Sequence, residues 1–359
     1  MGNMKTLTQQ FPMTAFWMDS LKAEDILYGI GNGSRGETTS PSITTYALEA
    51  AEKQARPEML ELHREMPRST ERDLLWEWTY RKAAEGSAHL LPQFDPNGPD
   101  GRFAIQADVF SYNDPDKMIA QGKKINSLGR NVFIKIPTTP AGLIATEELL
   151  AGGYSVMNTA TSSVNQVLAA CEAQMRGLAR REEKGETGYV FHAVATQLGL
   201  QDMCYQGYAK LNGIELSEGA KKYGAIAVAK KAHALLAGEG YTGVYMLSNI
   251  TTIEHVTEFF GGDIALTLPR RWHDYIDSHE YDYVARMSIP VDRTITDELL
   301  ATVPFYKMAY TVGELDMDDL RGYPVFCRTF NFFTEIYERS LHVVRDVMLP
   351  DPYDEGRAH

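Results

Sequence analysis

The sequence predicts an α/β chain folded as a (β/α)8 TIM barrel, with an enlarged N-terminal helical region and a C-terminal helical extension. Short apolar runs with strand character recur along the chain, a stretch of helical period follows most of them, and eight such repeats can be counted. Alternating strands and helices form parallel sheets, and eight repeats favour a closed barrel. An open doubly wound sheet produces a similar local pattern.

Seven of the predicted strands are apolar runs, and the remaining one, Gly36–Ser40, is short and polar. The seven apolar strands are Thr14–Met18, Phe103–Ala107, Asn131–Ile136, Tyr154–Thr159, Tyr189–Ala195, Thr242–Leu247 and Asp263–Leu268. Helical periodicity between them is clearest at Pro140–Ala151, Ser163–Arg181 and Leu216–Leu236.

Two segments exceed a minimal barrel. The first, Thr44–Ser87, is charged and helical, and the second is the tail that begins near Arg270. We therefore expect a barrel over residues 1–270 and a C-terminal helical extension over residues 271–359. The tail ends in an amphipathic helix at Phe330–Leu349, which packs on its own barrel, covers the barrel mouth or contacts a partner subunit.

The composition excludes several classes of protein. Hydrophobic residues make up 44% and charged residues 23% of the 359 residues, as in an ordinary globular protein. No apolar run approaches the length that spans a bilayer, and three widely spaced cysteines suit a reducing compartment, so we expect a cytoplasmic protein without a membrane partner. The net charge of −13, without a long basic run, argues against binding to nucleic acid.

A lysine lies inside one apolar strand, in the run Arg-Asn-Val-Phe-Ile-Lys-Ile-Pro. Because side chains alternate along a strand, Phe133 and Lys135 share one face and the flanking aliphatic residues share the other. In a barrel Lys135 then points inward, where burial favours the neutral amine that forms Schiff bases with carbonyls. A lysine that reaches solvent at the strand end, or that pairs with an acid, gives the same pattern.

Other polar residues end apolar strands, among them Asp19, Gln106, Asp108 and Thr159. Catalytic residues of barrel enzymes lie at these carboxyl ends. Each residue alone is more often a hydrogen-bonded cap, but several on neighbouring strands indicate a site.

These segments resemble the transaldolase family of class I aldolases. The stretch from Asn131 to Ala173, NVFIKIPTTPAGLIATEELLAGGYSVMNTATSSVNQVLAACEA, is similar to that family's lysine strand, following helix and threonine strand. The segment FWMDS resembles its first strand, ETTSPSITTYALE its Thr-Thr-Asn-Pro-Ser signature, and ALTLP its last strand. The resemblance covers roughly Thr14 to Pro269 and weakens after about Arg180.

The resemblance implies four catalytic residues. Lys135 becomes the Schiff-base lysine, and Asp19 the carboxylate that handles the substrate hydroxyl proton during carbon–carbon cleavage. Thr159 and Gln106 position the catalytic water, where transaldolases proper use a glutamate in place of Gln106. Glutamine at this place is a feature of the fructose-6-phosphate aldolase branch, and it holds water without exchanging protons as a carboxylate does.

The chain also departs from the family. Ser40 replaces the signature asparagine that binds the dihydroxyacetone unit, and Met157 replaces a second asparagine, for which the neighbouring Asn158 is the expected substitute. On the sixth strand, Phe191 and Ala193 match neither branch fully. We take Ser40 and Asn158 as substrate-binding candidates.

The family's phosphate-binding positions, after strands six and seven, are occupied by Thr196 and Ile250, which cannot bind phosphate as arginine does. The arginines available as substitutes are Arg35, Arg270 and Arg271. We take Arg270, with Ser248 at the end of the seventh strand, as further substrate-binding candidates. The expected substrate either lacks phosphate or has its anion held differently.

Three rival features carry other interpretations. The GxGxxG pattern at Gly31–Gly36 follows a predicted helix, whereas the dinucleotide fingerprint follows a strand, which favours a loop. His192 is either a core histidine or a catalytic one. A cluster of potential ligands after the last strand indicates either a metal-dependent aldolase or an acidic solvated helix. It consists of His273, Asp274, Asp277, His279 and Glu280.

We therefore expect an enzyme that cleaves or transfers a dihydroxyacetone-like unit from a ketose through a lysine Schiff base. It needs no metal or organic cofactor, its partner is a small-molecule sugar, and we expect a homo-oligomer. The alternatives are a non-catalytic barrel that binds a ligand or another protein and, less favoured, a metal-dependent aldolase.

Overall fold

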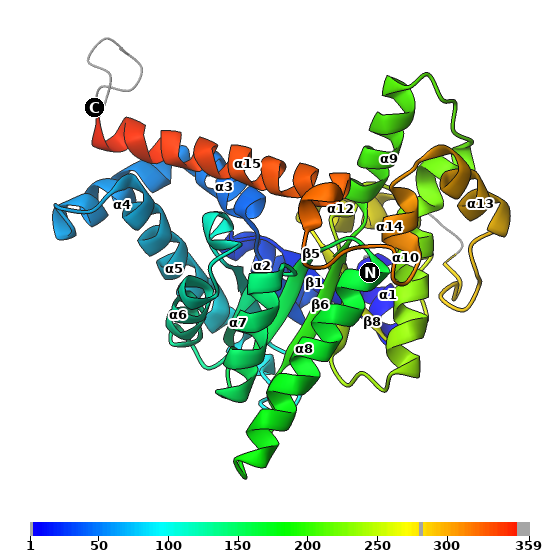
Figure 1. Ribbon diagram of the computed structural model, residues 1–359. Helices are drawn as coiled ribbons and strands as arrows, with labels where there is room; N and C mark the ends of the chain where they lie inside the picture. Colours follow the sequence, from blue (N-terminus) through cyan, green and yellow to red (C-terminus); the bar gives the residue numbers. More distant parts are fainter. Residues whose placement is uncertain (1–2, 280–282, 350–359) are drawn as a thin grey trace.

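The computed structural model describes residues 3–279 and 283–349, and its eight parallel strands close into a barrel in sequence order (Figure 1). The strands are β1 (Thr14–Asp19), β2 (Gly36–Thr38), β3 (Arg102–Gln106), β4 (Val132–Pro137), β5 (Val156–Thr161), β6 (His192–Gln197), β7 (Val244–Ser248) and β8 (Ile264–Leu268). The predicted (β/α)8 barrel is confirmed. Even the polar run at Gly36–Ser40 supplies a strand, shortened to three residues because Ser40 already caps the next helix.

Strand alternation divides the apolar residues between two cores. One set fills the barrel interior: Trp17, Ala104, Phe133, Met157, Phe191, Ala193, Ala195, Met246 and Ala265. The larger set lies between the strands and the surrounding helices. Gly36 is required where β2 passes the interior tryptophan, because a Cβ at this position would lie 2.7 Å from the Trp17 ring.

Helices cover the outside of the barrel (Figure 1). Those in the first half of the chain are α1 (Asn3–Gln10), α2 (Ala23–Gly31), α3 (Pro41–Ala50), α4 (Glu52–Glu65), α5 (Glu71–Leu90), α6 (Pro115–Asn126), α7 (Pro140–Ala151) and α8 (Val164–Glu183). Those in the second half are α9 (Gly199–Leu211), α10 (Glu218–Gly238), α11 (Glu254–Thr257), α12 (Arg270–Ser278), α13 (Arg293–Thr302), α14 (Tyr306–Tyr310) and α15 (Pro324–Met348). Short 3-10 turns are η1 (Leu91–Gln93), η2 (Val109–Ser111) and η3 (Leu320–Gly322).

The turn after the lysine strand shows how the sequence ends a strand and begins a helix. The Thr139 hydroxyl accepts a hydrogen bond from the Gly142 N–H at 2.9 Å, and Pro140 occupies the first turn of α7. Gly142 has no substitute here, because a Cβ would lie 1.9 Å from the Pro137 carbonyl oxygen. These contacts define the turn that follows the carboxyl end of β4.

The enlarged N-terminal region and the last helix pack on each other. Helix α15 contacts α3, α4, α5 and α9, and it lies across the carboxyl end of the barrel (Figure 1). Thr45 and Ser340 share a hydrogen bond at 2.6 Å, and Arg339 pairs with Glu49. The sequence analysis left open whether this helix packs on its own chain or on a partner subunit. In the structure, α15 packs on its own chain.

The remainder of the tail also packs on the barrel helices. Helices α13 and α14 contact α10, and α12 begins at Arg270, so one helix runs across the expected boundary at residue 270. Across the described residues, no helix combines the length and apolar character that a membrane crossing requires.

Candidate active site

A ring of polar side chains faces inward at the carboxyl end of the barrel. One residue from each strand contributes to it: Asp19, Thr38, Gln106, Lys135, Thr159, Gln197, Ser248 and Thr267. The four residues expected to be catalytic thus lie at the same end of the barrel, three of them on the neighbouring strands β3, β4 and β5 and Asp19 on β1. Gln106 and Lys135 are direct partners in the register of β3 and β4.

Lys135 is buried, with 4% of its surface exposed. Its Nζ donates to the Thr39 carbonyl oxygen at 3.1 Å, and it forms no ion pair with any described residue. Burial lowers the pKa of Lys135 from its ordinary value, and the charge of Asp19 offsets part of this effect. The site therefore favours the nucleophilic neutral amine.

Asp19 ends β1, and two hydroxyl groups orient its carboxylate. Thr38 Oγ1 donates to Asp19 Oδ1 at 2.7 Å and also lies 2.5 Å from Thr267 Oγ1. Burial raises the pKa of Asp19, while Lys135, the Thr38 hydrogen bond and Arg271 each lower it. The low dielectric of the interior thus brings the lysine and carboxyl pKa values toward each other, which suits proton exchange between substrate and Asp19.

Three buried oxygen atoms around the ring lack a hydrogen-bond partner among the described residues. They are Gln106 Oε1, Thr159 Oγ1 and Gln197 Oε1. Thr159 directly precedes an irregularity of β5, where Ala160 adopts a positive φ of 53° and the register with β6 shifts. Because buried polar atoms are nearly always paired in native proteins, these oxygens indicate positions for water or for substrate hydroxyls.

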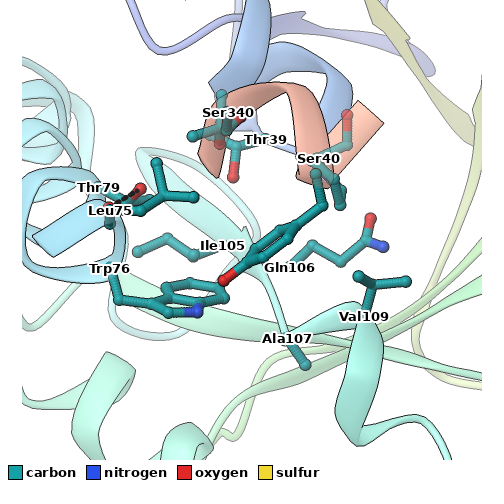
Figure 2. Close-up of a pocket in the computed structure, with 13 residues that line it drawn as sticks. Thr39, Ser40, Leu75, Trp76, Thr79, Ile105, Gln106, Ala107, Val109 and Ser340 are labelled. Carbon is teal, nitrogen blue, oxygen red and sulfur yellow. Dashed lines mark hydrogen bonds between the residues drawn. The ribbon is translucent and has the colours of Figure 1, made fainter. Parts of the chain in front are cut away.

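Of the two predicted substrate-binding serines, Ser248 belongs to this ring and Ser40 lies near it. Ser40 caps α3 by accepting from the Ile43 N–H at 3.3 Å, and it lines a small cavity together with Gln106, Trp76 and Thr79 (Figure 2). Ser248 faces inward at the end of β7, with its hydroxyl 3.4 Å from the Thr196 carbonyl oxygen. Both positions are compatible with their expected role.

The structure does not bring Asn158 to the ring. Its Nδ2 donates to Thr146 Oγ1 at 2.9 Å and its Oδ1 accepts from Gln174 Nε2 at 2.7 Å, so the side chain lies between β5 and the helices outside. The one-residue offset from Met157 reverses the direction of the side chain, as the alternation of a strand requires. The expectation that Asn158 replaces the missing asparagine is therefore wrong.

Arg270 lies at the mouth of the barrel but is engaged by its neighbours. Its Nε donates to Asp274 Oδ1 at 2.7 Å, and the guanidinium lies 3.4 Å from the centre of the Tyr28 ring. Arg35 pairs with Asp100 and precedes β2, at the amino end of the barrel. Arg271, which lines a chamber with Asp19, forms no ion pair within the described residues.

The two positions that bind phosphate in the resembled family carry neutral side chains, one hydrogen-bonded to a neighbour and the other buried. Thr196 points outward and accepts a hydrogen bond from the Tyr245 hydroxyl at 2.9 Å, and Ile250 is buried. The two loops also close on each other, because a Cβ at Gly199 would lie 2.4 Å from Thr251. No arginine from these positions enters the ring.

The rival features take structural roles in the part of the chain that is described. His192 faces outward, with its ring nitrogens 3.0 Å from the Val190 carbonyl oxygen and 3.1 Å from Thr242 Oγ1. Burial lowers its pKa, as expected for a neutral core histidine. The GxGxxG segment follows helix α2 and forms the approach to β2, not a strand-to-helix turn.

The cluster expected as a possible metal site is dispersed. Asp274 pairs with Arg270, and Asp277 accepts from the Tyr28 hydroxyl at 2.6 Å. His273 is buried, which lowers its pKa to about 4, and Glu280 lies outside the described residues. No group of three potential metal ligands occurs among the residues that are described.

Several site residues were missed by sequence reasoning. Gln197 follows Ala193 and Ala195 at intervals of two, so strand alternation alone would have identified it as inward-facing. Thr38 and Thr267 lie on strands whose carboxyl ends were recognised, but nothing in the sequence shows that their hydroxyls meet beside Asp19.

The fold and the ring together define a barrel with a buried lysine and carboxylate at its carboxyl end. The family described as Transaldolase/Fructose-6-phosphate aldolase matches residues 16–308, and the chain belongs to this family. The match ends before α15.

Individual relatives align over shorter regions. A transaldolase of Mycolicibacterium paratuberculosis (strain ATCC BAA-968 / K-10) is 38% identical over 102 residues, which is 28% of this chain and 27% of the relative. Transaldolases of Mycobacterium tuberculosis (strain H37Rv) and Mycobacterium leprae (strain Br4923) are 34% identical over 110 residues and 38% identical over 91 residues, respectively. The first of these alignments spans 30% of this chain and 30% of the relative, and the second spans 25% of this chain and 24% of the relative. Each alignment therefore covers less than a third of either protein.

Proposed function

We propose that the chain is a transaldolase or aldolase-type enzyme that forms a Schiff base between Lys135 and a ketose. The observation that carries this proposal is a buried lysine that pairs with no carboxylate among the described residues. It lies one layer above Phe133 in the barrel interior and within electrostatic reach of Asp19. A structural lysine at such a depth needs a carboxylate partner, whereas a nucleophilic lysine needs to lose its proton.

The reaction begins with addition of the neutral Lys135 Nζ to the ketose carbonyl carbon. The resulting carbinolamine takes up a proton at its hydroxyl and loses water, which leaves an iminium on the lysine. Gln106 lies beside Lys135 in the barrel register, and its Oε1, which has no partner among the described residues, is proposed to accept a hydrogen bond from that water.

Carbon–carbon cleavage then needs a base for one substrate hydroxyl. Asp19 accepts the proton from the hydroxyl on the carbon that becomes the aldehyde. The adjacent carbon–carbon bond then breaks, and the electron pair of that bond moves into the iminium to give an enamine. Thr38 holds the carboxylate in position during this step. The raised pKa of Asp19 makes it a stronger base than an exposed aspartate.

The enamine on Lys135 has two fates. It adds to a second aldehyde, with Asp19 returning the proton, or it is protonated at carbon and the iminium is hydrolysed by water. Gln106 and Thr159, whose buried oxygens have no partner among the described residues, are proposed to hold this water. A glutamine can hold this water but cannot exchange protons with it as a carboxylate does.

The substrate is proposed to be atypical in one respect. Because Thr196 and Ile250 replace the family's basic residues and the loops after β6 and β7 close on each other, no phosphate is held there. Ser248 and Gln197 present neutral hydrogen-bonding groups at this side of the ring, which suit sugar hydroxyls.

A ketose panel tests the proposed activity. The enzyme is incubated with phosphorylated and unphosphorylated ketoses, with and without an acceptor aldehyde, and the released aldehyde and three-carbon product are quantified. Turnover is expected in the parent and in the exposed-lysine control Lys123→Met, and its loss is expected in Lys135→Met. Absence of turnover on every ketose, or equal turnover in Lys135→Met, would reject the proposal.

A further inference from the structure

Two threonine hydroxyls form a chain that ends on the carboxylate of Asp19. Thr38 lies on β2 and Thr267 on β8, the two strands that flank β1, and both side chains belong to the inward-facing ring. Thr38 Oγ1 donates to Asp19 Oδ1 at 2.7 Å and lies 2.5 Å from Thr267 Oγ1. Among the described residues, Thr267 therefore reaches the carboxylate by hydrogen bonding only through Thr38.

The chemistry of a hydroxyl group fixes the direction of this chain. A hydroxyl has one proton to donate and two lone pairs with which to accept. Because Thr38 gives its proton to Asp19, it can only accept from Thr267. Thr267 therefore donates to Thr38, and both hydrogen bonds point toward the carboxylate.

The chain is shielded from solvent, which makes each hydrogen bond in it more important. Both threonines are buried, and Thr267 has 1% of its surface exposed. Burial raises the pKa of Asp19, and the hydrogen bond from Thr38 lowers it. Hydrogen bonds in a chain polarise one another, so the donor at Thr267 strengthens the bond that Thr38 makes to the carboxylate.

We propose that Thr267 is a positioning residue for carbon–carbon cleavage, because its hydroxyl fixes the direction of the chain that keeps Asp19 ionised. A protonated Asp19 cannot accept the proton of the substrate hydroxyl, and burial alone favours that protonated form. The two threonines oppose this effect with hydrogen bonds that the ionised carboxylate accepts more strongly than the neutral acid. This inference rests on the proposed function and adds Thr267 to the residues that serve it.

The charged and titratable groups around Asp19 stay in place when Thr267 is changed. Among the described residues they are Lys135 on β4, Glu37 on β2, Lys22 and Asp25 at the start of α2, and Arg270 and Arg271 at the start of α12. None of them bonds to Thr267 among the described residues. A shift in the titration of Asp19 on loss of the Thr267 hydroxyl therefore reports on the chain.

The pH dependence of kcat for ketose cleavage tests the inference, because it reports the groups that titrate in the enzyme–substrate complex. Thr267→Val replaces the hydroxyl with a methyl group of similar size, and is expected to move the acid limb upward by about half a pH unit to one pH unit. Thr267→Ser keeps the hydroxyl and is expected to retain the parent profile. The control Thr296→Val removes a buried hydroxyl that donates to the Arg293 carbonyl oxygen within α13, and is expected to leave the profile unchanged.

A second variant and a second measurement complete the test. Thr267→Ala also removes the hydroxyl, without a methyl group in its place, and is expected to shift the limb in the same direction as Thr267→Val. An unshifted limb in both variants, or an equal shift in Thr267→Ser, would overturn the inference. Borohydride trapping of dihydroxyacetone on Lys135 involves no carbon–carbon cleavage, so its pH profile is expected to be the same in the parent and the Thr267 variants. Failure of the parent to form this adduct would instead overturn the proposed function.

Discussion

A buried carboxyl group next to the site gives a stability prediction with a defined sign. Glu37 lies on β2 with 1% of its surface exposed. Its Oε1 accepts the Ser20 N–H at 2.6 Å, and its Oε2 has no partner among the described residues. Burial raises the pKa of Glu37 well above 4.5, the Ser20 hydrogen bond offsets part of this, and the charges of Asp19 and Asp25 add to it. Burial therefore keeps Glu37 protonated to higher pH in the folded protein than in the unfolded chain.

The pH dependence follows from the protons bound in each state. Above the unfolded-state pKa, the unfolded chain has released the Glu37 proton and the folded chain still holds it, so the free energy of unfolding falls as pH rises. The slope for one such group is about 1.4 kcal/mol per pH unit up to its folded-state pKa. Glu37→Gln removes this loss, so the variant should gain stability over the parent as the pH rises from about 5, by at most about 1.4 kcal/mol for each pH unit.

Urea unfolding of both proteins at about pH 5, 6 and 7 measures this gain, since glutamine keeps the Ser20 hydrogen bond. The control Glu65→Gln removes an exposed carboxylate whose pKa is lowered by Arg81, so it is ionised in both states over this range. The stability difference between that control and the parent should not change with pH. A pH-independent difference for Glu37→Gln as well would refute the reasoning, because it would mean that Glu37 ionises in the folded protein.

Three further substitutions have defined outcomes. Asp19→Asn should still form the borohydride-trapped adduct but cleave ketoses on the order of a hundredfold more slowly or worse, because it lacks the proton acceptor; an unchanged cleavage rate would exclude Asp19 as the base. Gln106→Glu should place a carboxylate beside Lys135, raise the pKa of that lysine and move the pH dependence of adduct formation upward; an unshifted profile would contradict this. Gly36→Ala should lower the free energy of unfolding by about 1–3 kcal/mol, because the added methyl would lie 2.7 Å from the indole of β1. Gly31→Ala, which meets nothing within 4 Å, should be close to neutral in the same denaturation assay.

Sequence reasoning located the barrel and the lysine for a physical reason. Alternating apolar runs and helical periods are local features, and strand alternation dictates that a lysine two residues from Phe133 shares its face. The predicted helix Pro140–Ala151 agrees with α7 because a threonine cap and a proline define its start. Features of this kind depend on residues that are close together in the sequence, so they can be predicted from the sequence alone.

The errors arose where a side chain's role depends on alternation or on distant partners. Asn158 was expected in the site although its neighbour Met157 holds the inward position, which reverses its direction. Arg270 and Arg271 are adjacent in sequence, and only the folded chain shows that Asp274 engages the first. Pairings between residues far apart in the chain, such as Thr45 with Ser340, have no local signal at all.

Borohydride reduction in the presence of dihydroxyacetone, read by peptide mass spectrometry, tests the Schiff base most directly. Lys230 is an internal comparison, since it is also largely buried but pairs with Glu258 at 2.8 Å. The structure predicts an adduct on Lys135 and none on Lys230, with loss of the adduct in Lys135→Met. No adduct on Lys135, or an adduct that persists in Lys135→Met, would contradict Schiff-base catalysis and favour a barrel that binds its ligand without chemistry.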